Sequence, residues 1–147
     1  MKSLSERLRN LFRLPPGERA ILAEAWGLFL LVELALRVLS FKRLLGLHRK
    51  LSRTTGATPA SGRPASLARV VWLVEVAGRY APVNPTCLKK ALVLSWLLGR
   101  WGIPTALRIG VSREEGKLRA HAWLDYAGEP ILGGQEAGRY EPLFHSR

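Results

Sequence analysis

The sequence predicts an α+β fold, with helices in the first part of the chain and a small antiparallel sheet in the last part. Apolar residues recur with helical spacing at 4–12, 20–39, 67–77 and 87–100. Shorter segments with strand character, separated by turn residues, follow at 105–111, 118–126 and 130–132. Helices that precede strands in this way are typical of an α+β domain with antiparallel pairing.

The composition is that of a globular protein with a basic N-terminus. Of the 147 residues, 48% are hydrophobic and 23% are charged, which excludes disorder as the main state. The formal net charge is +12, and residues 1–53 contribute eleven Lys or Arg against four Glu, a net +7. This excess favours an acidic partner, but it does not choose among protein, peptide, nucleic acid and anionic lipid.

Breaks in the pattern divide the chain into regions. Residues 52–66 are rich in Ser, Thr, Gly, Pro and Ala and contain no large apolar residue. We therefore predict a basic, apolar N-terminal helical region over 1–53, a linker over 54–66 and the main domain over 67–147.

The most apolar stretch, residues 20–39, is close to the length of a membrane-spanning helix. Glu24, Glu33 and Arg37 interrupt it, and each charge would cost about 2.5–3.5 kcal/mol near the centre of a bilayer. The pattern favours a buried or interfacial helix, which begins at Pro15 and Pro16 because prolines block a preceding helix and can open the next.

Cys87 is the single cysteine, so the chain can form no intramolecular disulfide. With His48, His121 and His145 it provides no paired metal-ligand spacing, and we expect no metal and a cytoplasmic location. Cys87 begins a predicted helix, where the helix dipole favours the thiolate and hence a nucleophile. The alternative is a small buried apolar side chain.

His121 is the best candidate for a catalytic base. It lies on a predicted strand that supplies a rigid mount, and alternation places it on one face with Trp123 and Asp125. In that role its imidazole would take the proton of Cys87 and later donate it to a leaving amine. The alternative is a structural histidine. Neither His48 nor His145 has comparable support.

A base usually has an orienting partner, and Asp125 is about 13 Å away along a strand, too far for a hydrogen bond. A hairpin turn at 127–128 would pair Tyr126 with Glu129 and place His121 opposite Gly134. The orienting group should then come from residues 133–136. Glu136 shares a face with His121 and is the tentative third member, whereas Gln135 would need a glycine bulge to re-aim it. Glu136 can equally be a solvated surface charge.

Three segments together form a family pattern: PTCLKKALVL at 85–94, GIPTALRIGV at 102–111 and AHAWLD at 120–125. They closely resemble the transglutaminase-like cysteine proteases that act as leader peptidases in lasso-peptide biosynthesis. The resemblance covers about residues 65–143. It implies a transglutaminase-like or papain-like core, in which a helix bearing the cysteine packs on a small antiparallel sheet.

The resemblance also implies the chemistry and the partners. Cys87 would be the nucleophile and His121 the base, with no cofactor, and the substrate a ribosomally made precursor peptide with leader and core. A separate leader-recognition protein and an ATP-using lasso cyclase would act with it, and no nucleic acid is expected. The family's third catalytic residue is an Asp about twelve positions after the histidine, where this chain has Gly133. The acid would therefore be absent, shifted to Glu136, or replaced by an amide or a backbone carbonyl.

Two other functions fit parts of the pattern. The absent Asp fits a non-catalytic transglutaminase-like binding module that acts through its basic N-terminus. The basic, apolar residues 1–50 fit a protein attached to an anionic membrane surface. In either case the apolar surface of Trp26, Phe29, Leu30 and Val32 should pack on the core or meet a partner or membrane.

Overall fold

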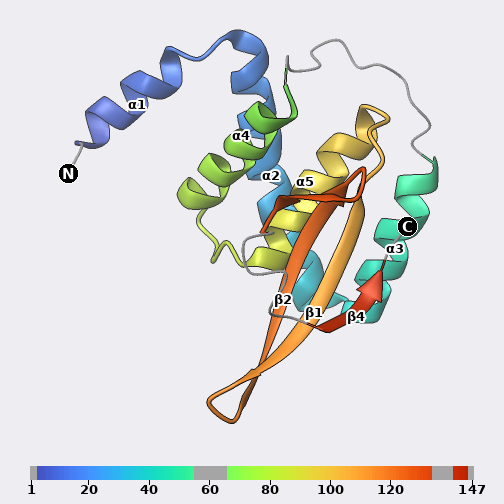
Figure 1. The fold of residues 1–147 in the computed structure, drawn as a ribbon. Coiled ribbons are helices and arrows are strands. Elements are labelled where there is room, and N and C mark those ends of the chain that lie inside the picture. The colour runs from blue at the N-terminus through green and yellow to red at the C-terminus, as the bar shows by residue number, and fades with distance from the viewer. Residues whose placement is uncertain (1–2, 55–65, 134–140, 146–147) are drawn as a thin grey trace.

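The fold is α+β, as the sequence predicts. A computed structural model describes residues 3–54, 66–133 and 141–145 (Figure 1). Its helices are α1 (Leu4–Phe12), α2 (Pro16–Val38), α3 (Phe41–Thr54), α4 (Leu67–Tyr80) and α5 (Cys87–Arg100). Its strands are β1 (Ala106–Glu114), β2 (Lys117–Tyr126), β3 (Glu129–Leu132) and β4 (Glu141–His145). Most of the predicted linker lies outside the described residues, so it stays a prediction.

The helices begin where the sequence supplies caps. Ser3 and Glu6 form a reciprocal capping box at the start of α1, and Ser66 and Thr86 accept a backbone N–H at the starts of α4 and α5. Pro16 opens α2, as expected for a residue that lacks the N–H left unpaired at this position. Local chemistry therefore fixes the first residue of α5, which is Cys87.

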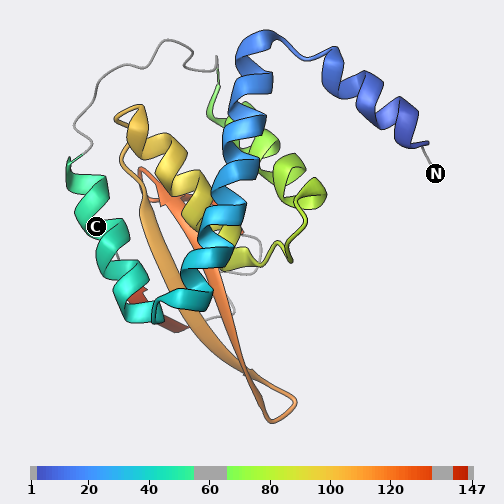
Figure 2. The same cartoon turned by 180° about the vertical axis from the view of Figure 1, so that it is seen from behind.

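One hydrophobic core joins the N-terminal helices to the rest of the chain. Phe29 of α2, Leu73 of α4, Leu94 of α5 and Leu124 of β2 are all fully buried in it. The two opposite views place α5 between the sheet and α2 (Figures 1 and 2). Of the N-terminal apolar side chains singled out above, Phe29 packs in this core, whereas Trp26 is 41% exposed and Leu30 is 36% exposed.

Acidic side chains of α2 pair with basic side chains of the core helices. Glu18 forms a bidentate ion pair with Arg69 of α4, with both N–O distances 2.8 Å. Glu24 pairs with Arg100 at the end of α5, and Glu33 with a lysine near its start. Two of the charges that interrupt the apolar stretch, Glu24 and Glu33, thus fasten α2 to α5, and Glu18, just before the stretch, fastens it to α4. Among the described residues, no helix is long and apolar enough to cross a membrane.

The sheet is antiparallel, and its strand order in the described residues is β3-β2-β1-β4. Residues with positive φ form both hairpin turns: Glu115 and Gly116 (51° and 76°), then Ala127 and Gly128 (52° and 84°). Such turns match the twist of the flanking strands. The sequence analysis did not predict β4, which pairs with β1 at the edge of the sheet.

The predicted register of the β2–β3 hairpin is only partly right. Tyr126 pairs with Glu129 as predicted, and Asp125 with Pro130, but Leu124 then pairs with Leu132. One extra residue in β3 therefore shifts the register between Asp125 and Leu124. A bulge of this kind bends the bulged strand and re-aims the residues beyond it. Gly134, which was predicted to lie opposite His121, is outside the described residues.

Candidate active site

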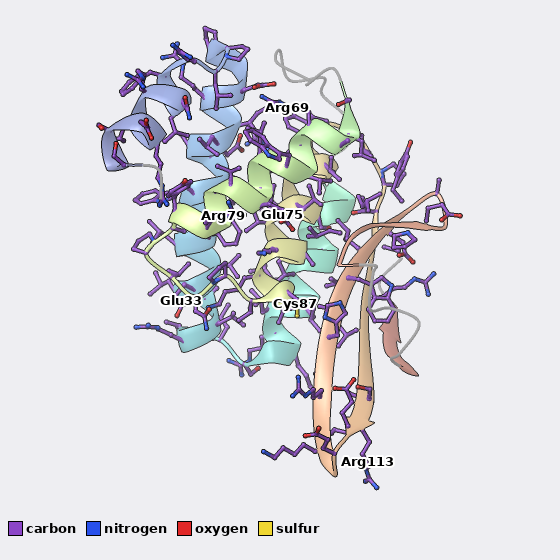
Figure 3. The ribbon with its side chains drawn as sticks, turned by 60° about the vertical axis from the view of Figure 1, so that its left-hand side comes forward. Glu33, Arg69, Glu75, Arg79, Cys87 and Arg113 are labelled. Carbon is purple, nitrogen blue, oxygen red and sulfur yellow. The ribbon has the colours of Figure 1, made fainter. Side chains whose placement is uncertain are left out.

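Cys87 is the first residue of α5, at the point where this helix meets the sheet (Figure 3). The Thr86 side chain caps the helix by accepting the Lys89 N–H at 3.4 Å. Cys87 is partly exposed. The first N–H groups of a helix have no partners within the helix, so a negative charge that forms here meets unpaired donors and the positive end of the helix dipole.

Cys87 contacts β2 next to His121. The Ala122 N–H donates to the Cys87 Sγ at 3.5 Å. Within the described residues, β3 pairs with β2 from Tyr126 to Leu124, and Cys87 approaches β2 just beyond this segment. Because Ala122 directly follows His121 in the chain, this contact brings the two predicted catalytic residues, 34 positions apart in sequence, into one site.

The His121 ring is oriented by a main-chain group. Its Nε2 lies 2.7 Å from the Gly133 carbonyl oxygen. A carbonyl can only accept, so Nε2 donates, and in the neutral ring Nδ1 is left with the lone pair that a base needs. Trp123 stacks alongside, with ring centroids 6.1 Å apart and planes inclined by 20°. The imidazole is therefore held in the tautomer whose Nδ1 can accept a proton.

Gly133 can bring its carbonyl to His121 because it has no side chain. Its φ is +72°, and a Cβ here would lie 3.0 Å from the Ala122 oxygen and 3.3 Å from His121 Nε2. This is the position where the lasso-peptide family has Asp. The chain thus presents a carbonyl where the resemblance implies a carboxylate, which is one of the alternatives that the sequence left open.

The other candidates for an orienting group are placed elsewhere or not described. Asp125 is 6% exposed and forms an ion pair with Arg108 of the neighbouring strand. Gln135 and Glu136 lie outside the described residues, so the role of Glu136 stays a prediction. The side chains of His48 and His145 also lie outside them. In the part of the chain that the structure describes, no three His, Cys, Asp or Glu residues gather as a metal site would require.

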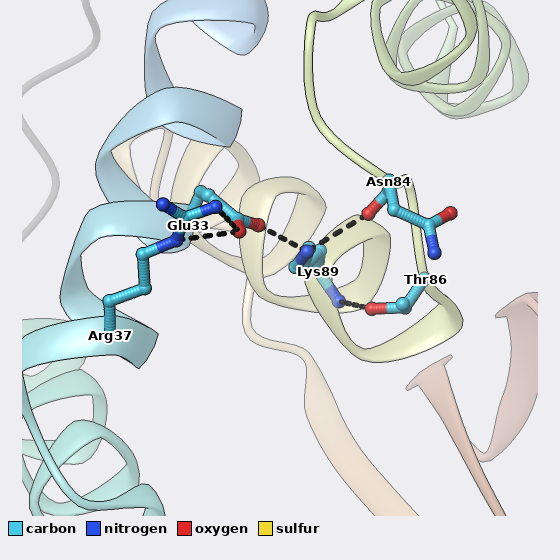
Figure 4. A network of polar contacts seen from close by, with 5 residues as sticks. All are labelled: Glu33, Arg37, Asn84, Thr86 and Lys89. Carbon is cyan, nitrogen blue, oxygen red and sulfur yellow. Dashed lines mark hydrogen bonds and ion pairs between the residues drawn. The ribbon is translucent and has the colours of Figure 1, made fainter.

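A polar network supports the turn that precedes Cys87 (Figure 4). The Lys89 Nζ donates to the Asn84 carbonyl at 3.0 Å and forms an ion pair with Glu33 of α2. Arg37 donates to the same carboxylate at 3.2 Å. The hydrogen bond from Lys89 holds the pKa of the Glu33 carboxyl below its ordinary value of 4.5, and its charge and that of Arg37 add to the effect.

Close packing supports the same turn from the other side. Gly78 of α4 is buried, and a Cβ there would lie 3.0 Å from the Phe29 ring and 3.3 Å from the Pro85 Cβ. The helix backbone, a core phenyl ring and the proline two residues before the cysteine therefore meet without spare room. This contact restricts how far the turn can move.

The sequence predicted Cys87 and His121 and left open a backbone carbonyl near Gly133 as the orienting group, but the Glu33–Lys89 pair was missed. The Gly133 carbonyl carries no side-chain signal, and only a Gly-Gly pair at the end of a strand pointed to a bend. The Glu33–Lys89 pair had a weak signal, since an acidic residue inside an apolar helix needs a buried cation. The sequence did not indicate which Lys or Arg would pair with Glu33.

Comparison with known families assigns most of the chain to one family. A family model described as the transglutaminase-like superfamily matches residues 28–145 of the chain. The match begins within α2 and includes residues 28–38 of this helix, Glu33 among them. Neither the curated proteins nor the solved structures gave a match.

Proposed function

Because this chain belongs to the transglutaminase-like superfamily, which includes cysteine proteases, we propose that it is a cysteine peptidase. Its substrate in this proposal is a ribosomally made lasso-peptide precursor, from which it removes the leader. The observation that carries the proposal is the single site in which Cys87 contacts the residue after His121 while the Gly133 carbonyl orients the imidazole.

In the first half of the reaction, His121 Nδ1 takes the Cys87 proton as the sulfur attacks the scissile carbonyl carbon. The peptide oxygen gains the negative charge, and N–H groups at the start of α5 stabilise it. The carbon–nitrogen bond then breaks, and the imidazolium gives its proton to the departing amine. A thioester between Cys87 and the leader remains.

In the second half, His121 takes a proton from a water molecule that attacks the thioester. The carbon–sulfur bond breaks, the leader leaves as a carboxylic acid, and the thiol is restored by the proton on the imidazolium. The Gly133 carbonyl accepts the Nε2–H throughout, so it keeps the ring aligned and stabilises the imidazolium through its dipole.

The partners follow from the resemblance and are part of the same proposal. A leader-recognition protein would deliver the precursor, and an ATP-using lasso cyclase would consume the freed core peptide. The net charge of +12 supports an acidic partner of some kind. Cleavage measured with and without the candidate recognition protein tests whether it is needed.

Attachment to an anionic membrane surface is a second candidate role, and exposed apolar side chains on α2 favour it. Leu31, Leu34 and Val38 are 57%, 58% and 74% exposed along one side of the helix. Residues 34–74 contain eight Lys or Arg and no Asp or Glu. Exposed apolar side chains beside an acid-free basic segment suit a negatively charged lipid surface.

The experiment that tests the proposed reaction is precursor cleavage followed by mass spectrometry. We expect the wild-type protein to release leader and core, and Cys87→Ala and His121→Ala each to abolish release while remaining folded. A non-catalytic binding module would instead bind the leader and leave it whole in all three proteins.

A further inference from the structure

Lys89 is a buried lysine two residues after the cysteine. It is 8% exposed, and an ammonium group is unfavourable in such a place unless it is paired and hydrogen-bonded. Its Nζ meets both conditions, because it forms an ion pair with Glu33 and donates to the Asn84 carbonyl at 3.0 Å. The first partner is in α2 and the second is in the turn before Cys87 (Figure 4).

The Asn84 carbonyl is the point on which this turn is fixed. It accepts the Thr86 N–H at 2.9 Å as well as the Lys89 ammonium group. Thr86 in turn caps α5 by accepting the Lys89 N–H at 3.4 Å. Lys89 therefore holds the turn at both ends, through its side chain at Asn84 and through its backbone at Thr86. Cys87 is the next residue, so its direction depends on this turn.

The ammonium group is held in place by α2. The Glu33 carboxylate is bound by Lys89 and also by Arg37, whose Nε lies 3.2 Å away. A carboxylate fixed by two cations has little freedom to move. It therefore fixes the ammonium group that bonds to the turn.

We propose that Lys89 is a positioning residue that aims Cys87 at His121, and that Glu33 of α2 holds it for this task. The proposal rests on the proposed function, since it concerns the residue assigned as nucleophile. It makes α2 part of the catalytic apparatus, although α2 lies far from Cys87 in sequence and supplies no reacting atom.

An ion pair that only stabilises the fold predicts different behaviour. Such a pair tolerates exchange of its two charges, because Glu at 89 and Lys at 33 still attract each other. A bond to the Asn84 carbonyl requires a donor at 89, and a carboxylate there is an acceptor only. The double variant Glu33→Lys with Lys89→Glu therefore distinguishes a role of Lys89 in stability from a role in positioning Cys87.

The test uses the rate of Cys87 alkylation by iodoacetamide, followed by intact mass. The chain has one cysteine, so each added mass reports on Cys87 alone. The rate depends on the thiolate that a well-placed imidazole supports, and it can be measured without any precursor. Failure of the proposed peptidase activity would therefore leave this test intact.

We expect Lys89→Met to lower the alkylation rate about tenfold, as His121→Ala does. In the His121→Ala background, Lys89→Met should have no further effect, because the two changes remove the same interaction. Lys89→Arg keeps a donor and should recover most of the rate. Lys90→Met is the matched control, because the Lys90 Nζ lies 3.9 Å from a carboxylate oxygen of Glu75 in α4. Cys87 in this variant should be alkylated at the wild-type rate.

The exchanged variant Glu33→Lys with Lys89→Glu gives the sharpest outcome. We expect it to recover thermal stability relative to Lys89→Met but not the alkylation rate. If Lys89→Met does not fold, Lys89→Arg and the exchanged variant still decide the matter. A folded Lys89→Met that alkylates at the wild-type rate, or an exchanged variant that recovers the rate, would overturn the proposal.

Discussion

Replacing Gly133 with Ala tests whether its carbonyl orients the catalytic histidine. The new Cβ would lie 3.0 Å from the Ala122 oxygen, a backbone atom that cannot move away cheaply, and 3.3 Å from His121 Nε2. The residue also has a φ of +72°, which L-residues with a Cβ disfavour. The segment should therefore shift and lengthen the 2.7 Å bond between the carbonyl and the ring.

The expected size of the effect follows from two terms. The left-handed conformation costs Ala about 1–2 kcal/mol, and forcing a methyl group into a closed contact costs about 1–3 kcal/mol more. We therefore expect the free energy of unfolding to fall by about 2–5 kcal/mol. Turnover should fall by about 10- to 100-fold, because a ring displaced by even about 1 Å no longer meets the thiol.

Gly116→Ala is the matched control for the backbone term. Gly116 has nearly the same φ, +76°, but nothing lies within 4 Å of a Cβ there. It lies in the β1–β2 turn, next to Arg113 at the end of the hairpin remote from Cys87 (Figure 3). This variant should lose about 1–2 kcal/mol and keep its turnover. Both free energies come from urea unfolding, and turnover comes from precursor cleavage.

The result that refutes the reasoning is a Gly133→Ala protein that cleaves as fast as Gly116→Ala. The carbonyl would then not orient His121, and a side chain such as Glu136 would again be the candidate orienting group. Gly133→Asp, which places the family's acid at its usual position, meets the same contact with the Ala122 oxygen. We expect the turnover of Gly133→Asp to fall as that of Gly133→Ala does. A rise in turnover would also contradict the role assigned to the carbonyl.

Three further predictions concern α2, α4 and α3. Gly78→Ala should raise the activation free energy of cleavage by more than it lowers the free energy of unfolding, because its Cβ would press on the turn that carries Cys87. Equal changes in the two free energies, measured by cleavage kinetics and urea unfolding, would contradict this. The lowered pKa of Glu33 makes its pairing with Lys89 a source of stability that is present above pH 4.5 and lost as the pH falls through the folded-state pKa. The melting temperature of Glu33→Gln should thus be below that of the wild type near neutral pH, and the difference should shrink in acid. A difference in melting temperature that does not change with pH would exclude this linkage. Reversing the exposed charges of Lys42 and Arg43 to Glu should weaken pelleting with anionic vesicles, and equal pelleting would count against membrane attachment.

The sequence was most informative where local chemistry decides the structure. Pro15 and Pro16 predict the start of α2, because prolines block a preceding helix and can open the next, and α2 begins at Pro16. The turn at Ala127 and Gly128 was likewise found from its residue types. The predicted positions of Cys87 at a helix start and His121 on a strand followed from these local signals.

It was least informative where distant segments decide the structure. The strand at 141–145 is short and pairs with β1 residues that lie 30 to 37 positions earlier, so its pairing could not be read locally. The register shift between Leu124 and Asp125 lies away from the turn residues, so the turn type did not predict it. The carbonyl of Gly133 is a backbone group that every residue has, so no residue type could announce its use at His121.

The claim that Cys87 performs nucleophilic catalysis is tested most directly by cleavage of a precursor peptide of the proposed class. Wild type and Cys87→Ala are incubated with that precursor and the recognition protein, and the products are weighed by mass spectrometry. We predict that the wild type yields separate leader and core and that Cys87→Ala yields neither, although it melts like the wild type. Leader release by folded Cys87→Ala would contradict the account.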